Sequence, residues 1–162
     1  RQEISAVLAP GVATASKSAR EIASSDVAGD AVTAHPACAP IELPPEPSSA
    51  GRARRHVRDC LVAIGHPELV ECAVLGVDEL VANVCVHAHT SLLLSMRLDQ
   101  AVVRIEVTDY SANLPVRQEG GSFALGGRGL TLLDACGTWG LGSPPAGGGK
   151  TIWFEPFTAL AS

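Results

Sequence analysis

Three polar residues recur at four-residue intervals near the middle of the chain. Glu79, Asn83 and His87 would form one row along an α-helix, because residues four apart lie on the same face. A carboxylate in such a row can act as a general base, and an amide oxygen is a hard ligand suited to Mg²⁺. An ordinary solvated helix face has the same spacing, so the row alone leaves both interpretations open.

A second chemical feature is the carboxylate of Asp109. It ends an apolar run at the point where the chain breaks into Tyr110-Ser111. A carboxylate at the end of a strand can accept a hydrogen bond from an exocyclic amine such as that of adenine. Aspartate also commonly initiates turns, which is the alternative interpretation.

Glycines dominate two later segments. GGRGL at residues 126–130 comes immediately before a short helical pattern, where backbone N–H groups and the helix dipole favour phosphate. GKT at residues 149–151 resembles the end of a P-loop, but Pro144 occupies the position of that loop's first glycine and lacks an N–H. A β-favouring run at 152–155 follows instead of a helix, so this segment is predicted to be a hinged loop entering a final strand.

Hydrophobic periodicity indicates the elements that position these residues. One helix is expected from the N-cap pair Ser48-Ser49 to a stop at Gly65, and a second from Pro67 to about His87. The remaining predicted elements are strands at 90–98 and 101–109 joined by a turn at Asp99-Gln100, a helix at 130–137, and strands at 138–142 and 150–155. The order predicts an α+β fold, a two-layer sandwich with a mixed, mostly antiparallel sheet covered on one face by helices. The apolar residues expected between the layers are Leu92, Leu94, Val103, Ile105, Val107, Ile152 and Phe154 on strands, and Val77, Leu80 and Val84 on the second helix.

Bulk composition narrows the class of protein. The chain has 162 residues, 46% of them hydrophobic, and a net charge of −5, which fits one globular domain and argues against nucleic acid as the main partner. Residues 1–47 are rich in Ala, Ser and Pro and are predicted to be a flexible extension ahead of a domain at 48–162. Apolar runs do not approach the roughly 20 residues of a membrane span. Five cysteines without a C-x-x-C pair predict reduced thiols in a cytoplasmic protein and no disulfide framework.

Four segments, taken in order, closely resemble the motifs of the GHKL (Bergerat-fold, histidine-kinase-like) ATPase superfamily. ELVANVCVHA at 79–88 resembles its N-box, and VTDYSANLP at 107–115 its first glycine box. GGRGLTLLDA at 126–135 resembles the second glycine box, and GKTIWFE at 149–155 the threonine motif of the last strand. The resemblance covers about residues 45–157 and is closest to the small stand-alone bacterial anti-sigma-factor serine kinases.

The resemblance implies a role for each matching residue. Glu79 would be the general base and Asn83 the ligand of Mg²⁺. Asp109 would accept a hydrogen bond from the adenine amine, supported by Thr151 directly or through water. The other residues that the resemblance assigns to the nucleotide site are His87, Asn113, Gly126, Gly127, Arg128, Gly129 and Leu130, with Gly127, Gly129 and Leu130 forming a lid over the phosphates and Arg128 a charge clamp.

One departure from the family pattern affects this site. The first glycine box usually reads D-x-G-x-G, whereas Ser111 and Asn113 occupy the glycine positions here. Asparagine tolerates a left-handed backbone better than most residues, but close backbone approach and lid hinging lose their glycines. The sequence therefore favours nucleotide binding over efficient turnover.

The leading functional hypothesis from the resemblance is an ATP- and Mg²⁺-dependent protein serine kinase. It would phosphorylate an anti-sigma-factor antagonist and sequester a sigma factor. The alternatives are a non-catalytic, nucleotide-gated protein-binding module and a structural domain with an inactive site. The sequence leaves open which sigma factor or antagonist is bound and whether the protein forms a homodimer.

Overall fold

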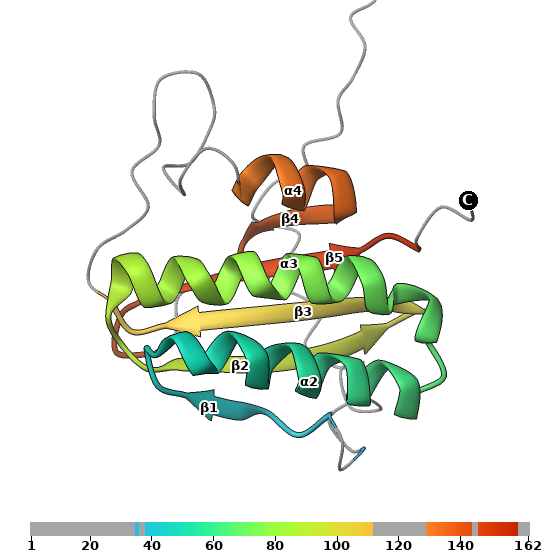
Figure 1. The fold of residues 1–162 in the computed structure, drawn as a ribbon, viewed down its shortest axis with the longest axis horizontal. Coiled ribbons are helices and arrows are strands. Elements are labelled where there is room, and N and C mark those ends of the chain that lie inside the picture. The colour runs from blue at the N-terminus through green and yellow to red at the C-terminus, as the bar shows by residue number, and fades with distance from the viewer. Residues whose placement is uncertain (1–34, 36–37, 112–128, 144–145, 159–162) are drawn as a thin grey trace, which may run out of the picture.

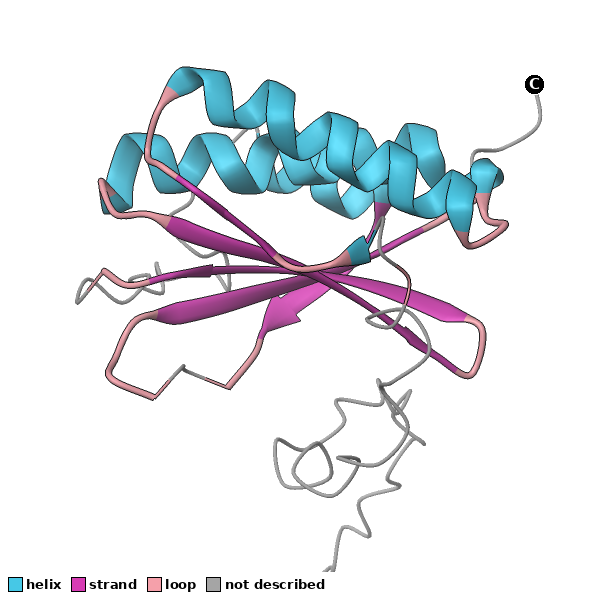
Figure 2. Cartoon of the chain, turned by 90° about the horizontal axis from the view of Figure 1, so that it is seen from below, coloured by secondary structure: helices cyan, strands magenta, loops and turns pink. Residues whose placement is uncertain are grey.

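The computed structural model describes residue 35 and residues 38–111, 129–143 and 146–158. Among these residues, three α-helices lie on one face of a five-stranded sheet, which Figures 1 and 2 show from two directions. In chain order the elements are β1 (Ile41–Leu43), α2 (Pro47–Ala63), a 3-10 helix (Pro67–Leu69), α3 (Val70–Asn83), a π-helix (Val84–Ala88), β2 (Leu92–Asp99), β3 (Val102–Asp109), α4 (Gly129–Cys136), β4 (Gly137–Leu141) and β5 (Lys150–Pro156). This two-layer α+β arrangement confirms the predicted fold class.

The strand order in the sheet is β1-β2-β3-β5-β4. Every pair of neighbours is antiparallel, so the described part of the sheet contains none of the parallel pairing that a mixed sheet would have. The β2–β3 hairpin closes at the pair Asp99–Val102, which puts its turn at Gln100-Ala101, one residue later than predicted. Both turn residues have positive φ, 46° and 72°, as the twist of a two-residue hairpin loop requires.

The core lies between α3 and the central strands. The strand and helix residues predicted to meet there are all buried, which confirms that prediction. Phe154 of β5 is fully buried, and a Cβ added to Gly76 of α3 would lie 2.2 Å from its ring. A Cβ on Gly137 of β4 would lie 2.5 Å from the same ring. These two glycines therefore let α3 and β4 approach Phe154 closely.

The N-terminal edge of the domain differs from the sequence prediction. Strand β1 lies upstream of Ser48, where we expected the domain to begin, and it pairs with β2. Helix α2 begins at Pro47, and the buried Ser49 hydroxyl donates to the Pro44 carbonyl at 2.6 Å instead of capping the helix. Residues 1–34 lie outside the described residues, and they make up most of the segment 1–47 that was predicted to be flexible.

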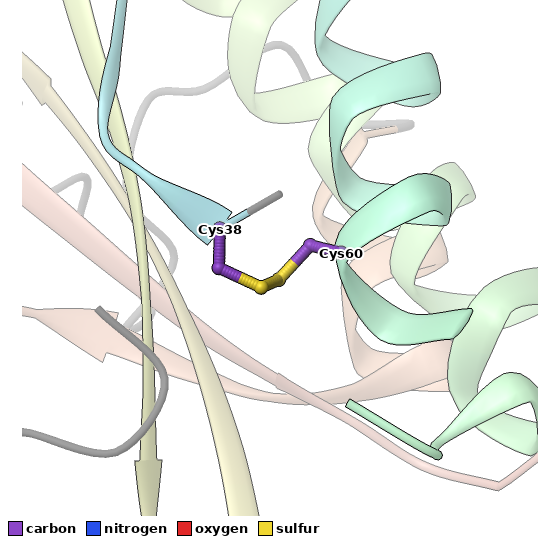
Figure 3. Close-up of a disulfide and its surroundings, with 2 residues drawn as sticks. All are labelled: Cys38 and Cys60. Carbon is purple, nitrogen blue, oxygen red and sulfur yellow. A yellow bond between two sulfur atoms is a disulfide. The ribbon is translucent and has the colours of Figure 1, made fainter. Parts of the chain in front are cut away.

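A disulfide joins this edge to the helix layer. Cys38 precedes β1 and is bonded to Cys60 of α2, with 4.9 Å between their Cα atoms (Figure 3). The prediction of five reduced cysteines is therefore wrong for this pair, because the fold brings together two sulfurs that are 22 residues apart in sequence. Cys72, Cys85 and Cys136 are free.

His56 lies one turn before Cys60 on α2 and is near the segment that precedes β1, which includes Ala39. Burial lowers the pKa of His56 from its usual 6.5, opposed by a hydrogen bond with the backbone of Ala39 and by the charge of Asp59. Its Nε2 is buried without a hydrogen-bond partner in the described part of the chain. A neutral imidazole therefore suits this position.

The predicted second helix ends near His87, as expected, but not as a regular α-helix. After Asn83 the chain forms the π-helix Val84–Ala88, and His89, with φ of 53°, ends it in the left-handed region. Because a π-turn has wider hydrogen bonding than an α-helix, side chains beyond Asn83 shift out of the four-residue row. Such turns occur frequently at functional sites.

Each helix in the described residues is too short or too polar to cross a lipid bilayer.

Candidate nucleotide site

Three of the four predicted motifs meet at one end of the sheet. The C-terminal ends of α3 and β3 and the start of β5 lie at the left of Figure 1. Asp109, the last residue of β3, is directly opposite Leu92 on one side and Lys150 on the other. The Tyr110 N–H donates to Thr90 Oγ1 at 3.3 Å, which ties the chain beyond β3 to the segment that follows the π-helix.

Asp109 is the most buried charged group of this end, with 1% of its surface exposed. Its Oδ1 accepts a hydrogen bond from the Ser111 N–H at 3.0 Å, and its Oδ2 lies 2.8 Å from Lys150 Nζ. A carboxylate oxygen can accept two hydrogen bonds, so each oxygen retains an acceptor position. Asp109 is thus a pre-positioned buried acceptor with an unused acceptor position on each oxygen.

Thr151 lies on the opposite face of the sheet from Asp109, and its predicted support of the adenine, directly or through water, stays a prediction. Its hydroxyl is 2.8 Å from the Thr108 hydroxyl, in a buried pair on the sheet face away from the helices. Successive side chains of a strand point to opposite faces, so Lys150 and not Thr151 lies beside Asp109. The sequence held a signal for this, because Lys150 has the same alternation phase as the core residues Ile152 and Phe154.

Glu79 and Asn83 are half-buried residues one turn apart at the end of α3. The Asn83 Nδ2 is buried and has no hydrogen-bond partner among the described residues. No hydrogen bond or ion pair joins the Glu79 carboxylate to any other described residue. An unpaired buried amide is unfavourable unless a ligand completes its hydrogen bonds, so this pair is a candidate binding and catalytic group.

The remaining predicted site residues are placed only in part. His87 lies in the π-helix and is exposed. Gly129 and Leu130 are the first two residues of α4, which packs against α3. The others, Asn113, Gly126, Gly127 and Arg128, lie outside the described residues.

The last residue of α4, Cys136, is not a reactive thiol. Burial and the neighbouring thiol of Cys72 raise the pKa of Cys136 to about 11. Nucleophilic cysteines instead have a lowered pKa in electropositive, partly exposed surroundings. Cys136 therefore remains protonated at neutral pH and acts as a small core residue.

Comparison with known proteins agrees with this geometry. No curated protein matches the chain. A family model described as a histidine kinase-like ATPase domain matches residues 43–136, which is more than half of the chain. The match runs from the end of β1 to the end of α4 and includes Glu79, Asn83 and Asp109. With helices on one face of an antiparallel sheet and a buried carboxylate at its end, the chain belongs to the histidine kinase-like ATPase domain family and is an ATP-binding domain.

Proposed function

We propose that this domain is an ATP- and Mg²⁺-dependent protein serine kinase of the anti-sigma-factor type. It phosphorylates a serine on an antagonist protein and sequesters a sigma factor. The kinase assignment is supported by the buried Asn83 amide nitrogen, which has no hydrogen-bond partner in the described part of the chain, and by the Glu79 carboxylate one turn before it. The protein partners rest on the resemblance of the four motifs to the small anti-sigma-factor kinases.

Asn83 is the residue that would hold Mg²⁺. Rotation of its side-chain amide exchanges nitrogen and oxygen, so an oxygen can occupy the position of the unpartnered Nδ2. In the described part of the chain, no three His, Cys, Asp or Glu side chains gather to hold a metal ion. Phosphate oxygens and water would supply the other ligands, which is how Mg²⁺ is commonly bound beside nucleotides.

Asp109 would hold the base and Glu79 would act on the substrate. The Asp109 carboxylate would accept a hydrogen bond from the adenine amine, and its burial excludes water that would compete for it. When bound, ATP supplies the phosphoryl group. Glu79 would accept or orient the proton of the attacking serine hydroxyl, which is the role of a positioned carboxylate in phosphoryl transfer.

The start of α4 would contribute to phosphate binding. Gly129 begins this helix, and the free N–H groups and dipole of a helix N-terminus favour anions. Gly126, Gly127 and Arg128 precede it in sequence. We assign Gly127, Gly129 and Leu130 to the lid over the phosphates and Arg128 to a charge clamp, with Gly126 as a further residue of the nucleotide site.

One observation favours the alternative, a non-catalytic module that ATP switches between binding states. The buried Ser111 replaces the first glycine of the usual motif, and its N–H donates to Asp109. A turn held in this way lacks the hinge that glycine would provide. Tight nucleotide binding with weak turnover would follow.

Phosphate transfer decides between the two functions. The assay uses radiolabelled ATP and the proteins that co-purify with the domain from its native cell, and mass spectrometry identifies the labelled serine. Glu79→Gln keeps the size of the side chain but removes the base, so we expect transfer to slow by about 100-fold or more. ATP affinity should stay within about twofold, because the base does not contact the nucleotide.

Glu71→Gln, at an exposed position two turns earlier on α3, is the matched control and should change neither quantity. Unchanged transfer by Glu79→Gln would contradict the general-base role. A parent protein that binds ATP but labels no protein would favour the nucleotide-gated binding module.

A further inference from the structure

The end of the site that contains Asp109 holds a second charged group. Lys150, the first residue of β5, is directly opposite Asp109 in the register, and its Nζ is 2.8 Å from Asp109 Oδ2. Both side chains are largely buried, with 2% of Asp109 and 13% of Lys150 exposed. Buried ion pairs contribute little net stability, because both groups lose their hydration. The pair at this strand end therefore points to a role other than holding the sheet together.

Gly149 fixes the position of this lysine. It has φ of +112°, and a Cβ added to it would lie 2.1 Å from the Asp109 carbonyl oxygen. A side chain at this position would be strained and would also push β5 away from the end of β3. Glycine lets the two backbones approach closely, so Lys150 enters β5 beside the carboxylate.

The pair offers a donor next to an acceptor. A carboxylate can only accept hydrogen bonds, and an ammonium group can only donate them. Adenine carries a complementary pair, because its exocyclic amine is flanked by two ring nitrogens, N1 and N7, that accept hydrogen bonds. A lone carboxylate would satisfy the amine and leave the neighbouring ring nitrogen without a partner from the protein.

We propose that Lys150 is a second base-recognising residue, whose ammonium group donates a hydrogen bond to the ring nitrogen, N1 or N7, beside the amine that Asp109 accepts. The inference rests on the proposed role of Asp109 at the adenine. Asp109 holds the Lys150 ammonium group in place, and the contacts with Lys150 and Ser111 leave one acceptor position on each carboxylate oxygen for the amine. The pair would therefore form hydrogen bonds with two atoms of the base, whereas Asp109 alone would bind one.

Calorimetric titration with ATP and two analogues tests this role without an activity assay. In 1-deaza-ATP a C–H group replaces N1, and in 7-deaza-ATP it replaces N7. The parent protein should bind one of the two analogues about 10-fold or more weakly than ATP, since a hydrogen bond to a charged group is lost. The analogue that weakens identifies which ring nitrogen Lys150 contacts.

Substitution of the lysine should remove that difference. In Lys150→Met the affected analogue should bind within about twofold of ATP, because no donor remains to be lost. Lys150→Gln retains a neutral donor, keeps a smaller difference, and serves if Lys150→Met does not fold. Arg104→Met is the matched control, because Arg104 bridges the same two strands to Glu155 on the opposite face of the sheet, with Nε 2.8 Å from the carboxylate. It should retain the full difference between ATP and the analogue.

The inference is overturned if the parent binds both analogues as tightly as ATP, or if the difference persists in Lys150→Met. Those results would leave nucleotide binding by the domain intact. A parent that does not bind ATP at all would instead overturn both this inference and the proposed function.

Discussion

The two faces of the sheet carry different ion pairs between the same two strands, β3 and β5. On the helix-covered face, Asp109 and Lys150 are 2% and 13% exposed. On the other face, Arg104 and Glu155 have exposed fractions of 32% and 23%, and the guanidinium also stacks over Trp153 at 4.4 Å from the ring centroid. The register and the strands are shared, so burial is the main difference between the two pairs.

This difference separates structural from functional charge. Partly exposed pairs are screened by solvent and usually contribute about 1 kcal/mol or less. A buried carboxylate is strongly unfavourable when its partner is removed, and it is available to a ligand that can replace water. The buried pair lies at the strand ends where three of the predicted motifs meet, whereas the outer pair lies farther along the same two strands.

Removal of the cation from each pair should give unequal losses of stability. Lys150→Met leaves the Asp109 carboxylate buried without its ion-pair partner and should lower the free energy of unfolding by about 3 kcal/mol. Arg104→Met should lower it by about 1 kcal/mol or less. Urea denaturation of both variants and the parent measures the two losses. Equal losses would show that burial does not distinguish the pairs.

Removing the carboxylate of each ion pair should weaken nucleotide binding only on the helix-covered face of the sheet. Asp109→Ala loses the acceptor for the adenine amine, so ATP and ADP should both bind about 10- to 100-fold more weakly. Glu155→Ala removes the outer carboxylate and should leave both affinities within about twofold. Titration calorimetry measures them. If Asp109→Ala binds ATP as tightly as the parent protein, the adenine does not bind at this end of the site.

The smallest expected effect is a pH dependence that arises in the helix layer. Because burial lowers the pKa of His56 in the folded state, the unfolded chain binds a proton more readily between that pKa and 6.5. The stability contributed by the neutral imidazole is therefore fully present above about pH 6.5 and is lost as the pH falls through the folded-state pKa. His56→Gln should flatten the fall in melting temperature between about pH 7.5 and 5.5. An unchanged pH profile in this variant would assign the fall to other groups.

Local pattern was enough to predict most of the elements and their order. The 3.6-residue period of Val77, Leu80 and Val84 and the alternation along β2, β3 and β5 are properties of neighbouring residues, and the structure buries all of these positions. The order and spacing of the four motifs predicted the family, because four segments at compatible spacing are far more specific than any one of them. The roles of Glu79 and Asn83 remain predictions. They are supported by the buried Asn83 amide nitrogen, which has no hydrogen-bond partner among the described residues.

Tertiary structure alone decided which residues meet. β1 has three residues, too few to show an alternation, and it becomes a strand only because β2 offers an unpaired edge. The pairing of Cys38 with Cys60 follows from where α2 passes the chain before β1, which no local pattern encodes. At β5 the sequence determined that neighbouring side chains point to opposite faces. The apolar residues Ile152 and Phe154 predicted which of these faces meets the helices, so what tertiary structure alone decided is the register of β5 against β3, which places Lys150 directly opposite Asp109.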